Sequence, residues 1–185
     1  LVRSRGLGDV YKRQIHISGN NGSGKTTLVK LLLGELEPTA GTIMRTGFSY
    51  LYIDQECSVI DPRLTVFEQT ERFNTGNWAE HELKSILNRY LFPYDTWDKG
   101  CACLSGGEKI RLLFCCLMIG NNAPDVFILD EPTNNLDIQS VEIITAAIKS
   151  YRGTVLLISH DHYFVKEIKI NRSIKLFDTG SVIKI

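Results

Sequence analysis

The chain has 185 residues, of which 43% are hydrophobic and 23% are charged, and its formal net charge is zero. This composition is ordinary for a globular protein with one substantial core. The balanced charge removes one argument for a nucleic-acid partner, a general basic field, without excluding such a partner. No apolar run approaches the ~20 residues that a membrane-spanning helix requires, and no apolar signal sequence opens the chain, so we expect no direct membrane insertion.

The first 14 residues do not resemble part of a fold, because they are basic and show no clean hydrophobic period. The segment Asp9–Gln14 matches a translation of GAT GTG TAT AAG AGA CAG, which resembles the end of a transposon used to build sequencing libraries. We therefore expect residues 1–14 to be a non-native or disordered leader and the native sequence to start near Ile15. The alternative is a genuine N-terminal extension, and continuous genomic coding through Asp9–Gln14 would establish it.

A strand, a glycine-rich loop and a helix follow in succession. The apolar run Ile15–Ser18 predicts a buried strand, and the run from Thr26 to Leu36 predicts a helix. The intervening residues fit Gly, four residues, Gly-Lys-Thr, the pattern of a phosphate-binding loop. Here glycines let backbone N–H groups turn toward a phosphate, and the helix dipole adds positive potential. The loop comprises Gly19, Asn20, Asn21, Gly22, Ser23, Gly24, Lys25, Thr26 and Thr27.

Two residues of this loop have specific predicted roles. Lys25 is a compact cation for the β- and γ-phosphates, and Thr26 offers a hydroxyl to Mg²⁺. The alternative is an ordinary glycine-rich turn before a helix. In the helix, the apolar face is expected to consist of Leu28, Leu31, Leu32 and Leu36.

The chain then changes from strand patterns to a helical block. A turn at Glu37–Gly41 precedes a short strand at Thr42–Arg45 and an aromatic strand at Phe48–Ile53, which ends before Gln55. Residues 58–120 read as an inserted helical subdomain. It is expected to contain a capping box at Thr65–Glu68 and a helix over Gly106–Ile119. A further helix is predicted over Ala79–Phe92, and its apolar face consists of Leu83, Ile86, Leu87, Tyr90 and Leu91. Trp78 and Trp97 are expected in the core.

The last third of the chain alternates strands and helices again. The segments Asp125–Glu131 and Thr154–Ser159 are predicted strands with consecutive apolar residues at their centres, as expected for a parallel sheet buried on both faces. Helices are predicted at Ile138–Tyr151 and His162–Ile168, and a hairpin could join Ser173–Phe177 to Ser181–Ile185. The fold class is therefore α/β, with a mainly parallel core over residues 15–57 and 121–185.

Polar side chains follow the ends of four predicted strands. In an open α/β sheet, ligands bind at the carboxyl ends of strands, so Gly19, Gln55, Asp130–Glu131 and His160 can converge on one site. Asp130 would hold Mg²⁺ and Glu131 would polarise an attacking water. The alternatives are two exposed acids in a loop and a histidine whose hydrogen bonds are merely satisfied.

A second glycine-rich segment opens the helix at Gly106. Ser105 and the two glycines provide a hydroxyl and free N–H groups at a helix start, which is an anion site. Because the phosphate loop already occupies the strand ends, this second anion site suggests a nucleotide held by another domain.

Together these segments resemble the ATP-binding cassette (ABC) superfamily, a group of P-loop NTPases, over essentially everything after Gln14. The resemblance identifies Gly19–Thr27 as Walker A, Gln55 as the Q-loop glutamine, Asp130 as the end of Walker B, Glu131 as the catalytic glutamate and His160 as the switch histidine. It implies ATP as ligand, Mg²⁺ held by Thr26, Gln55 and Asp130, and a second cassette as partner. The signature motif, which would act on the partner's nucleotide, is Leu104, Ser105, Gly106, Gly107 and Glu108, and the D-loop is Asn135, Leu136 and Asp137.

The segments Asp130–Asp137 and Ser159–Phe164 resemble the forms found in ABC-F proteins, and Glu108–Leu112 resembles the second of their two cassettes. That resemblance implies a cytoplasmic ATPase that acts on the ribosome in translation or antibiotic resistance. The alternatives are the ATPase subunit of a membrane transporter and an inactive fragment that only binds ATP.

The chain departs from a complete cassette at its start. The antiparallel β portion with its adenine-stacking aromatic residue is missing, and so are the other cassette and the linker. We therefore interpret the chain as a truncated cassette. The superfamily resemblance also implies that strand Thr154–Ser159 lies between strands Ile15–Ser18 and Val126–Asp130.

Overall fold

A computed structural model describes residues 13–45, 47–54, 57–120, 123–134 and 136–177. Its strands are β1 (Gln14–Ser18), β2 (Tyr50–Ile53), β3 (Val126–Asp130), β4 (Thr154–Ile158) and β5 (Arg172–Lys175). Its helices are α1 (Lys25–Leu33), α2 (Val66–Arg72), α3 (Glu80–Arg89), α4 (Gly106–Ile119), α5 (Ile138–Ser150) and α6 (His162–Glu167), with short 3₁₀ turns at Tyr94–Thr96 and Cys101–Cys103.

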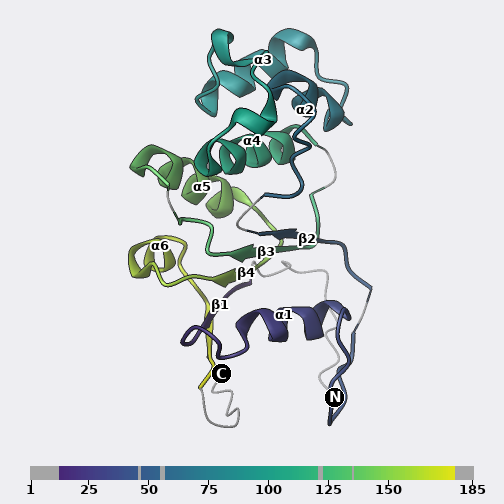
Figure 1. Cartoon of the computed structure of the whole chain (residues 1–185), viewed down its shortest axis with the longest axis vertical. Coiled ribbons are helices and arrows are strands. Elements are labelled where there is room, and N and C mark those ends of the chain that lie inside the picture. Colours follow the sequence, from purple (N-terminus) through teal and green to yellow (C-terminus); the bar gives the residue numbers. More distant parts are fainter. Residues whose placement is uncertain (1–12, 46, 55–56, 121–122, 135, 178–185) are drawn as a thin grey trace, which may run out of the picture.

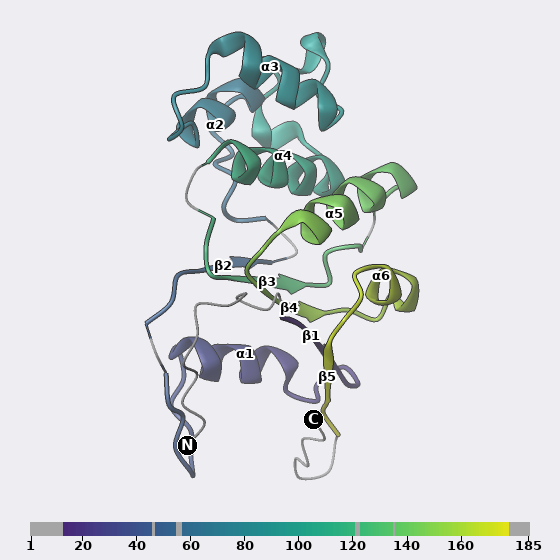
Figure 2. The same cartoon turned by 180° about the vertical axis from the view of Figure 1, so that it is seen from behind.

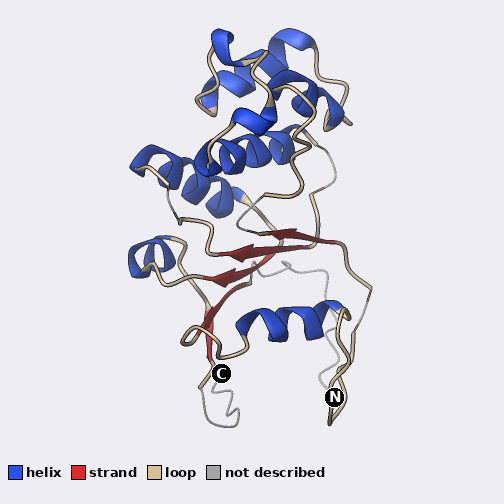
Figure 3. Cartoon of the chain, in the orientation of Figure 1, coloured by secondary structure: helices blue, strands red, loops and turns tan. Residues whose placement is uncertain are grey.

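The five strands form one parallel sheet in the order β2-β3-β4-β1-β5. Helix α1 lies against one face of this sheet. Helix α5 lies on the other side, with helices α2, α3 and α4 beyond it (Figures 1 and 3). The predicted α/β parallel fold is confirmed, and so is the position of β4 between β1 and β3. Because all strands run the same way, their carboxyl ends meet at one edge of the sheet.

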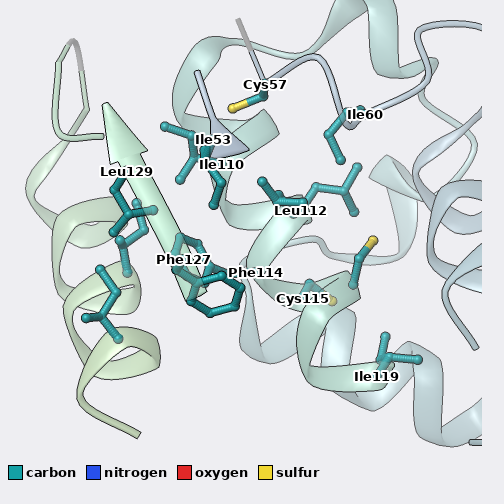
Figure 4. Close-up of a cluster of buried hydrophobic side chains, with 14 of the residues drawn as sticks. Ile53, Cys57, Ile60, Ile110, Leu112, Phe114, Cys115, Ile119, Phe127 and Leu129 are labelled. Atoms are coloured by element: carbon teal, nitrogen blue, oxygen red, sulfur yellow. The ribbon is translucent and has the colours of Figure 1, made fainter. Parts of the chain in front are cut away.

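Alternating side chains of each central strand build two separate cores. Ile128 of β3 faces α1, where it packs with Ile17, Val29 and Ile158. Its neighbours Phe127 and Leu129 face the opposite way, into the larger core shared with α4 and α5 (Figure 4). Burial on both faces explains why β3 and β4 read as continuous apolar runs.

Helices α2, α3 and α4 stack beyond α5 at the far end of the molecule (Figure 2). The capping box predicted at Thr65 is present, and α4 has the predicted bounds. Leu83, Ile86 and Leu87 are buried as expected. The prediction for Leu91 is wrong: α3 ends at Arg89, so Leu91 lies beyond the helix with a φ of 61° and is 40% exposed.

Trp97 packs against the large core as predicted, whereas Trp78 does not lie in it. Trp78 is 39% exposed, and its ring Nε1 donates to the Ile119 carbonyl oxygen at 3.0 Å. The five cysteines are unpaired, as expected of reduced thiols. Cys115 and Cys116 are buried in α4, where burial raises the pKa of both thiols.

Three segment predictions around α1 are wrong. Residues Thr42–Arg45 form no strand; instead the Arg45 guanidinium bonds the Leu31 carbonyl oxygen at 2.9 Å, which closes the end of α1. Helix α1 itself stops at Leu33, because Gly34 follows in the left-handed conformation. Its buried face consequently centres on Val29, with Leu28 and Leu33 packed beside it, and Leu36 is 42% exposed.

The first strand begins one residue earlier than predicted. Gln14 is buried and aligned with Val155, and the Val155 N–H donates to the Arg13 carbonyl oxygen at 2.8 Å. At the other end of the chain, β5 pairs in parallel with β1, and the second arm of the predicted hairpin, Ser181–Ile185, lies outside the described residues.

Candidate functional site

The loop after β1 closes on itself and leaves the start of α1 open. The Ser23 N–H donates to the Asn20 carbonyl oxygen at 3.1 Å, and Gly24 caps the helix with a φ of 92°, a left-handed conformation that favours glycine. No side chain caps this helix and no acidic residue occupies its first turn. The N–H groups of the first turn therefore remain available to an anion.

Gly19 is required for a different reason, a close approach of neighbouring atoms. A Cβ at this position would lie 2.5 Å from the Ser23 Oγ and 2.8 Å from the Leu176 carbonyl oxygen. The Leu176 N–H in turn donates to the Ser18 carbonyl oxygen at 2.8 Å. The segment after β5 thus packs directly against the start of the phosphate loop.

The Lys25 ammonium folds back over the loop that precedes it. Its Nζ donates to the Gly19 carbonyl oxygen at 2.8 Å and to the Asn20 carbonyl oxygen at 2.9 Å. Both acceptors belong to the loop itself, so the cation is held over the loop and beside the uncapped start of α1. Its role toward the β- and γ-phosphates stays a prediction.

Glu131 occupies a strained position directly after β3. Its φ is 51°, in the left-handed region that non-glycine residues seldom adopt, and its N–H donates to the Ile158 carbonyl oxygen at 2.9 Å. Its carboxylate accepts a hydrogen bond from the His160 N–H at 3.2 Å and lies 3.5 Å from the His160 Nε2. The structure therefore joins the predicted catalytic glutamate and switch histidine.

Asp130 is bonded to a residue that sequence reasoning missed. The Tyr52 hydroxyl donates to the Asp130 Oδ2 at 2.9 Å across the sheet. Burial, together with that hydrogen bond and the nearby carboxylates, raises the pKa of Tyr52 well above its ordinary value. The alternation along β2 could have placed Tyr52 on the same face as Ile128, but only the strand register shows that it reaches Asp130.

One open cavity of about 670 Å³ gathers these side chains at the carboxyl edge of the sheet. Asp54, which follows β2, is a second wall residue not predicted from sequence. Gln55 lies outside the described residues. His160 is not on the cavity wall but contacts Glu131, which is. The wall consists of Asn21, Gly22, Gly24, Lys25, Thr26, Thr27, Tyr52, Asp54, Asp130 and Glu131.

A larger open cavity of about 1440 Å³ lies at the opposite ends of β3 and β4. Its wall includes Asp125–Phe127, Tyr151 and Gly153–Thr154, and none of the predicted site residues. Ligands of open α/β sheets bind at the carboxyl ends of the strands. We therefore place the functional site in the smaller cavity.

The signature residues lie apart from this cavity and are bonded among themselves. The Ser105 Oγ accepts from the Glu108 N–H at 3.2 Å, and the Glu108 carboxylate accepts from the Ser105 N–H at 2.7 Å and from the Lys99 ammonium at 2.9 Å. Leu104 is buried, and a Cβ at Gly107 would lie 3.1 Å from the Leu136 Cδ2. Helix α4, which these residues open, lies beyond the face of the sheet opposite α1 (Figure 1).

The described part of the D-loop has a structural role in this chain. Leu136 packs against the large core, and Asp137 caps α5 by accepting from the Ser140 N–H at 2.7 Å. Hydrogen bonds from Ser140 hold the pKa of Asp137 below its ordinary value. Asn135 lies outside the described residues.

The donor set at the cavity fits magnesium bound together with a nucleotide. Asp130 supplies carboxylate oxygen and Thr26 a hydroxyl, both on the cavity wall. The described residues contain no cluster of three His, Cys, Asp or Glu side chains that could hold a metal alone. Mg²⁺ commonly binds through one or two carboxylates and completes its shell with phosphate oxygens and water.

Comparison with known proteins shows the family of this chain. The family described as "ABC transporter" matches residues 10–134, more than half of the chain. The chain belongs to the ABC transporter family. Its match begins before the glycine-rich loop and runs through Asp130 and Glu131.

Among curated relatives, ABC-F proteins are prominent. The cassette is 41% identical over 181 residues to ABC transporter F family member 5 of Arabidopsis thaliana, covering 96% of this chain and 26% of the relative. It is 39% identical over 158 residues to the probable ATP-binding protein YbiT of Escherichia coli O157:H7, covering 84% of this chain and 29% of that protein. The chain is thus an ABC-F-like cassette that spans about a quarter of the length of these relatives.

A solved complex of archaeal ribosomal stalk protein aP1 with the archaeal ribosome recycling factor aABCE1 is similar in structure. The TM-score is 0.69 at 29% identity, over 88% of this chain and 31% of that one. Within the described residues of the ABC cassette, no helix is long and apolar enough to cross a bilayer.

Proposed function

We propose that this chain binds and hydrolyses Mg·ATP as the second cassette of a cytoplasmic ABC-F-type protein that acts on the ribosome. The observation that carries the proposal is the cavity at the carboxyl edge of the sheet. It brings the Lys25 cation, the open start of α1 and the adjacent carboxylates of Asp130 and Glu131 to one place. Phosphoryl-transfer sites are built from these elements.

Each residue of the site has a role that follows from its chemistry. The N–H groups of the loop and Lys25 bind the phosphates, and Asp130 and Thr26, with Gln55, hold the metal. Mg²⁺ would neutralise charge that develops on the phosphate oxygens. Glu131 polarises the attacking water, while its bond to the His160 N–H keeps the carboxylate in place.

A second cassette is needed because the signature segment does not reach this chain's own cavity. None of its five residues lies on the cavity wall. Ser105 and Glu108 cap each other, and Ser105 and Gly106 at the start of α4 are exposed, while Gly107 is buried. We therefore assign the signature segment to the nucleotide of the partner cassette.

The ribosome is proposed as target because of the relatives. The F-family proteins match this chain over most of its length, and the aABCE1 structure is named as a ribosome recycling factor in complex with a ribosomal stalk protein. Those properties belong to the relatives, and their extension to this chain requires a direct test.

The test replaces Glu131 by Gln in the whole protein that carries this cassette. The amide keeps the shape of the side chain but cannot polarise water as a carboxylate does, so turnover should fall by about 10²–10⁴-fold while ATP stays bound. The protein should then accumulate with ribosomes in a sucrose-cushion pellet with ATP and not with ADP. The matched control is Glu142→Gln on the exposed side of α5, which should behave as the unchanged protein.

Other outcomes would favour the alternatives. Retention of Glu131→Gln with membranes, and absence from the ribosomal pellet with ATP binding confirmed, would indicate a transporter cassette. ATP binding without turnover in the unchanged protein would indicate a cassette that only binds nucleotide.

A further inference from the structure

Tyr52 is the one aromatic side chain on the wall of the phosphate cavity, as far as the structure describes the chain. It lies on β2, directly opposite Ile128 of β3 in the parallel register. Asp130 is two residues further along β3 and points to the same face, which makes it the diagonal neighbour of Tyr52. A tyrosine is long enough to span this diagonal, and its hydroxyl meets the Asp130 Oδ2 at 2.9 Å.

The Tyr52 ring and hydroxyl are held by different surroundings. The ring packs against the smaller core of Ile17, Val29, Ile128 and Ile158, below the start of α1. That packing fixes where the hydroxyl can reach, and the hydroxyl in turn occupies one of the two carboxylate oxygens of Asp130. The other carboxylate oxygen of Asp130, Oδ1, accepts no protein hydrogen bond within the described residues.

We propose that Tyr52 is a positioning residue for the metal: it holds the Asp130 carboxylate so that one defined oxygen faces the Mg²⁺ of bound Mg·ATP. This inference rests on the proposed ATP site. Residues that hydrogen-bond a metal-ligating carboxylate orient it, and their loss weakens metal binding. The nucleotide itself is bound by the loop and Lys25, so Tyr52 should act on the magnesium dependence of binding and not on nucleotide binding as such.

The chain contains a matched control on the same strand. Tyr50 lies two residues before Tyr52, on the same face by alternation, and is 43% exposed. It contacts the Phe48 ring, and its hydroxyl has no hydrogen bond within the part of the chain that the structure describes. Tyr50→Phe therefore removes the same atom from the same strand without touching Asp130.

The experiment measures binding of the non-hydrolysable β,γ-imido analogue of ATP to the 185-residue chain by calorimetry, in EDTA and at stepped Mg²⁺ concentrations. For Tyr52→Phe, the Mg²⁺ concentration for half-maximal enhancement of binding should rise about 10-fold, at the lower end of the effect of removing such a partner. Affinity in EDTA should be unchanged, and Tyr50→Phe should match the unchanged chain. In an Asp130→Asn background, Tyr52→Phe should have no further effect on the Mg²⁺ requirement.

Each other result overturns the inference in a recognisable way. An unchanged Mg²⁺ requirement in Tyr52→Phe shows that the hydroxyl does not position the ligand. Weaker binding in EDTA as well shows that Tyr52 only supports the fold of the loop, and equal effects of both variants show a general property of β2. If the unchanged chain shows no Mg²⁺-dependent binding of the analogue, the proposed ATP site is wrong, and this inference falls with it.

Discussion

Helices α1 and α4 both begin in glycine-rich sequence, yet their first turns are satisfied in opposite ways. At α1, Gly24 is the cap and no side chain bonds the helix start, which opens into the phosphate cavity. At α4, Ser105 and Glu108 cap each other, and Gly107 packs against Leu136. The first arrangement leaves donors for a ligand in the same chain, and the second uses the N–H groups of Ser105 and Glu108 for the cap.

This difference teaches that a glycine-rich helix start becomes the phosphate site of its own chain only where it is uncapped and faces a cation and carboxylates. Both starts carry the positive end of a helix dipole. Only α1 adds a cation over its own loop and two carboxylates across a cavity. The signature segment lies off the wall of this cavity, and we propose the nucleotide of another cassette as its ligand.

Among the changes that test this comparison of α1 with α4, the largest effect is expected from Lys25→Ala, which removes the cation of the α1 site. It removes the cation held at 2.8 Å from the Gly19 carbonyl oxygen, and charge-assisted hydrogen bonds of about 1.5–3 kcal/mol correspond to roughly a 10-fold to 100-fold loss of ATP affinity. Lys30→Ala, in the last turn of the same helix, should leave the affinity unchanged. Calorimetric titration of both variants with ATP tests this, and equal affinities for the two would contradict the assignment.

A smaller effect should separate the two glycines that open α4. A Cβ at Gly107 would meet Leu136 at 3.1 Å, while one at Gly106 would enter open space. Both alanine variants gain up to about 1 kcal/mol of helix propensity. Crowding should cost Gly107→Ala about 1 kcal/mol or more, so it should unfold at lower denaturant concentration than Gly106→Ala. Identical unfolding midpoints would show that the packed start of α4 has no energetic importance.

Removing the cap itself should have a similar or slightly smaller effect. Ser105→Ala loses the acceptor for the Glu108 N–H and should lower the free energy of unfolding by about 1 kcal/mol. Ser85→Ala, at an exposed position inside α3, removes a hydroxyl without removing a cap and should be neutral or slightly stabilising. Thermal unfolding of the two variants side by side measures the difference.

The smallest effect is a pH dependence of the α4 cap. Partial burial raises the pKa of Glu108, but hydrogen bonds from Ser105 and Lys99 outweigh it and hold the pKa below the ordinary 4.5. Because the folded pKa is the lower one, the carboxylate stabilises the fold above pH 4.5, and this contribution is lost as pH falls through the folded pKa. The stability difference between the unchanged chain and Glu108→Gln should therefore shrink in acid, and a constant difference down to pH 3 would rule out this ionic contribution.

Much of the fold was predictable from local pattern. Apolar runs within Val126–Asp130 and Thr154–Ile158 are continuous because both of their faces are buried, and Thr65 shows capping-box spacing because its helix uses it. At Ser105 a hydroxyl open to an anion was expected, and it instead accepts from the Glu108 N–H. The predictions failed where an isolated tertiary contact decides the structure. Arg45 folds onto the end of α1 instead of extending a strand, which no period in its own segment reveals.

The site shows the same division. Lys25, Asp130, Glu131 and His160 are recognisable because each follows a strand or opens a helix in sequence. Tyr52 was missed because its contact with Asp130 depends on the register between β2 and β3, and the sequence of neither strand alone determines that register.

The central claim is that α1 binds nucleotide within this chain and that α4 serves a nucleotide held elsewhere. The most direct test is a calorimetric titration of Mg²⁺ and ATP into the isolated 185-residue chain, its Lys25→Ala variant and its Ser105→Arg variant. We expect Lys25→Ala to lose most of the binding and Ser105→Arg to retain it, while Ser105→Arg abolishes turnover in the whole protein. A loss of binding by Ser105→Arg as large as that of Lys25→Ala would contradict the claim.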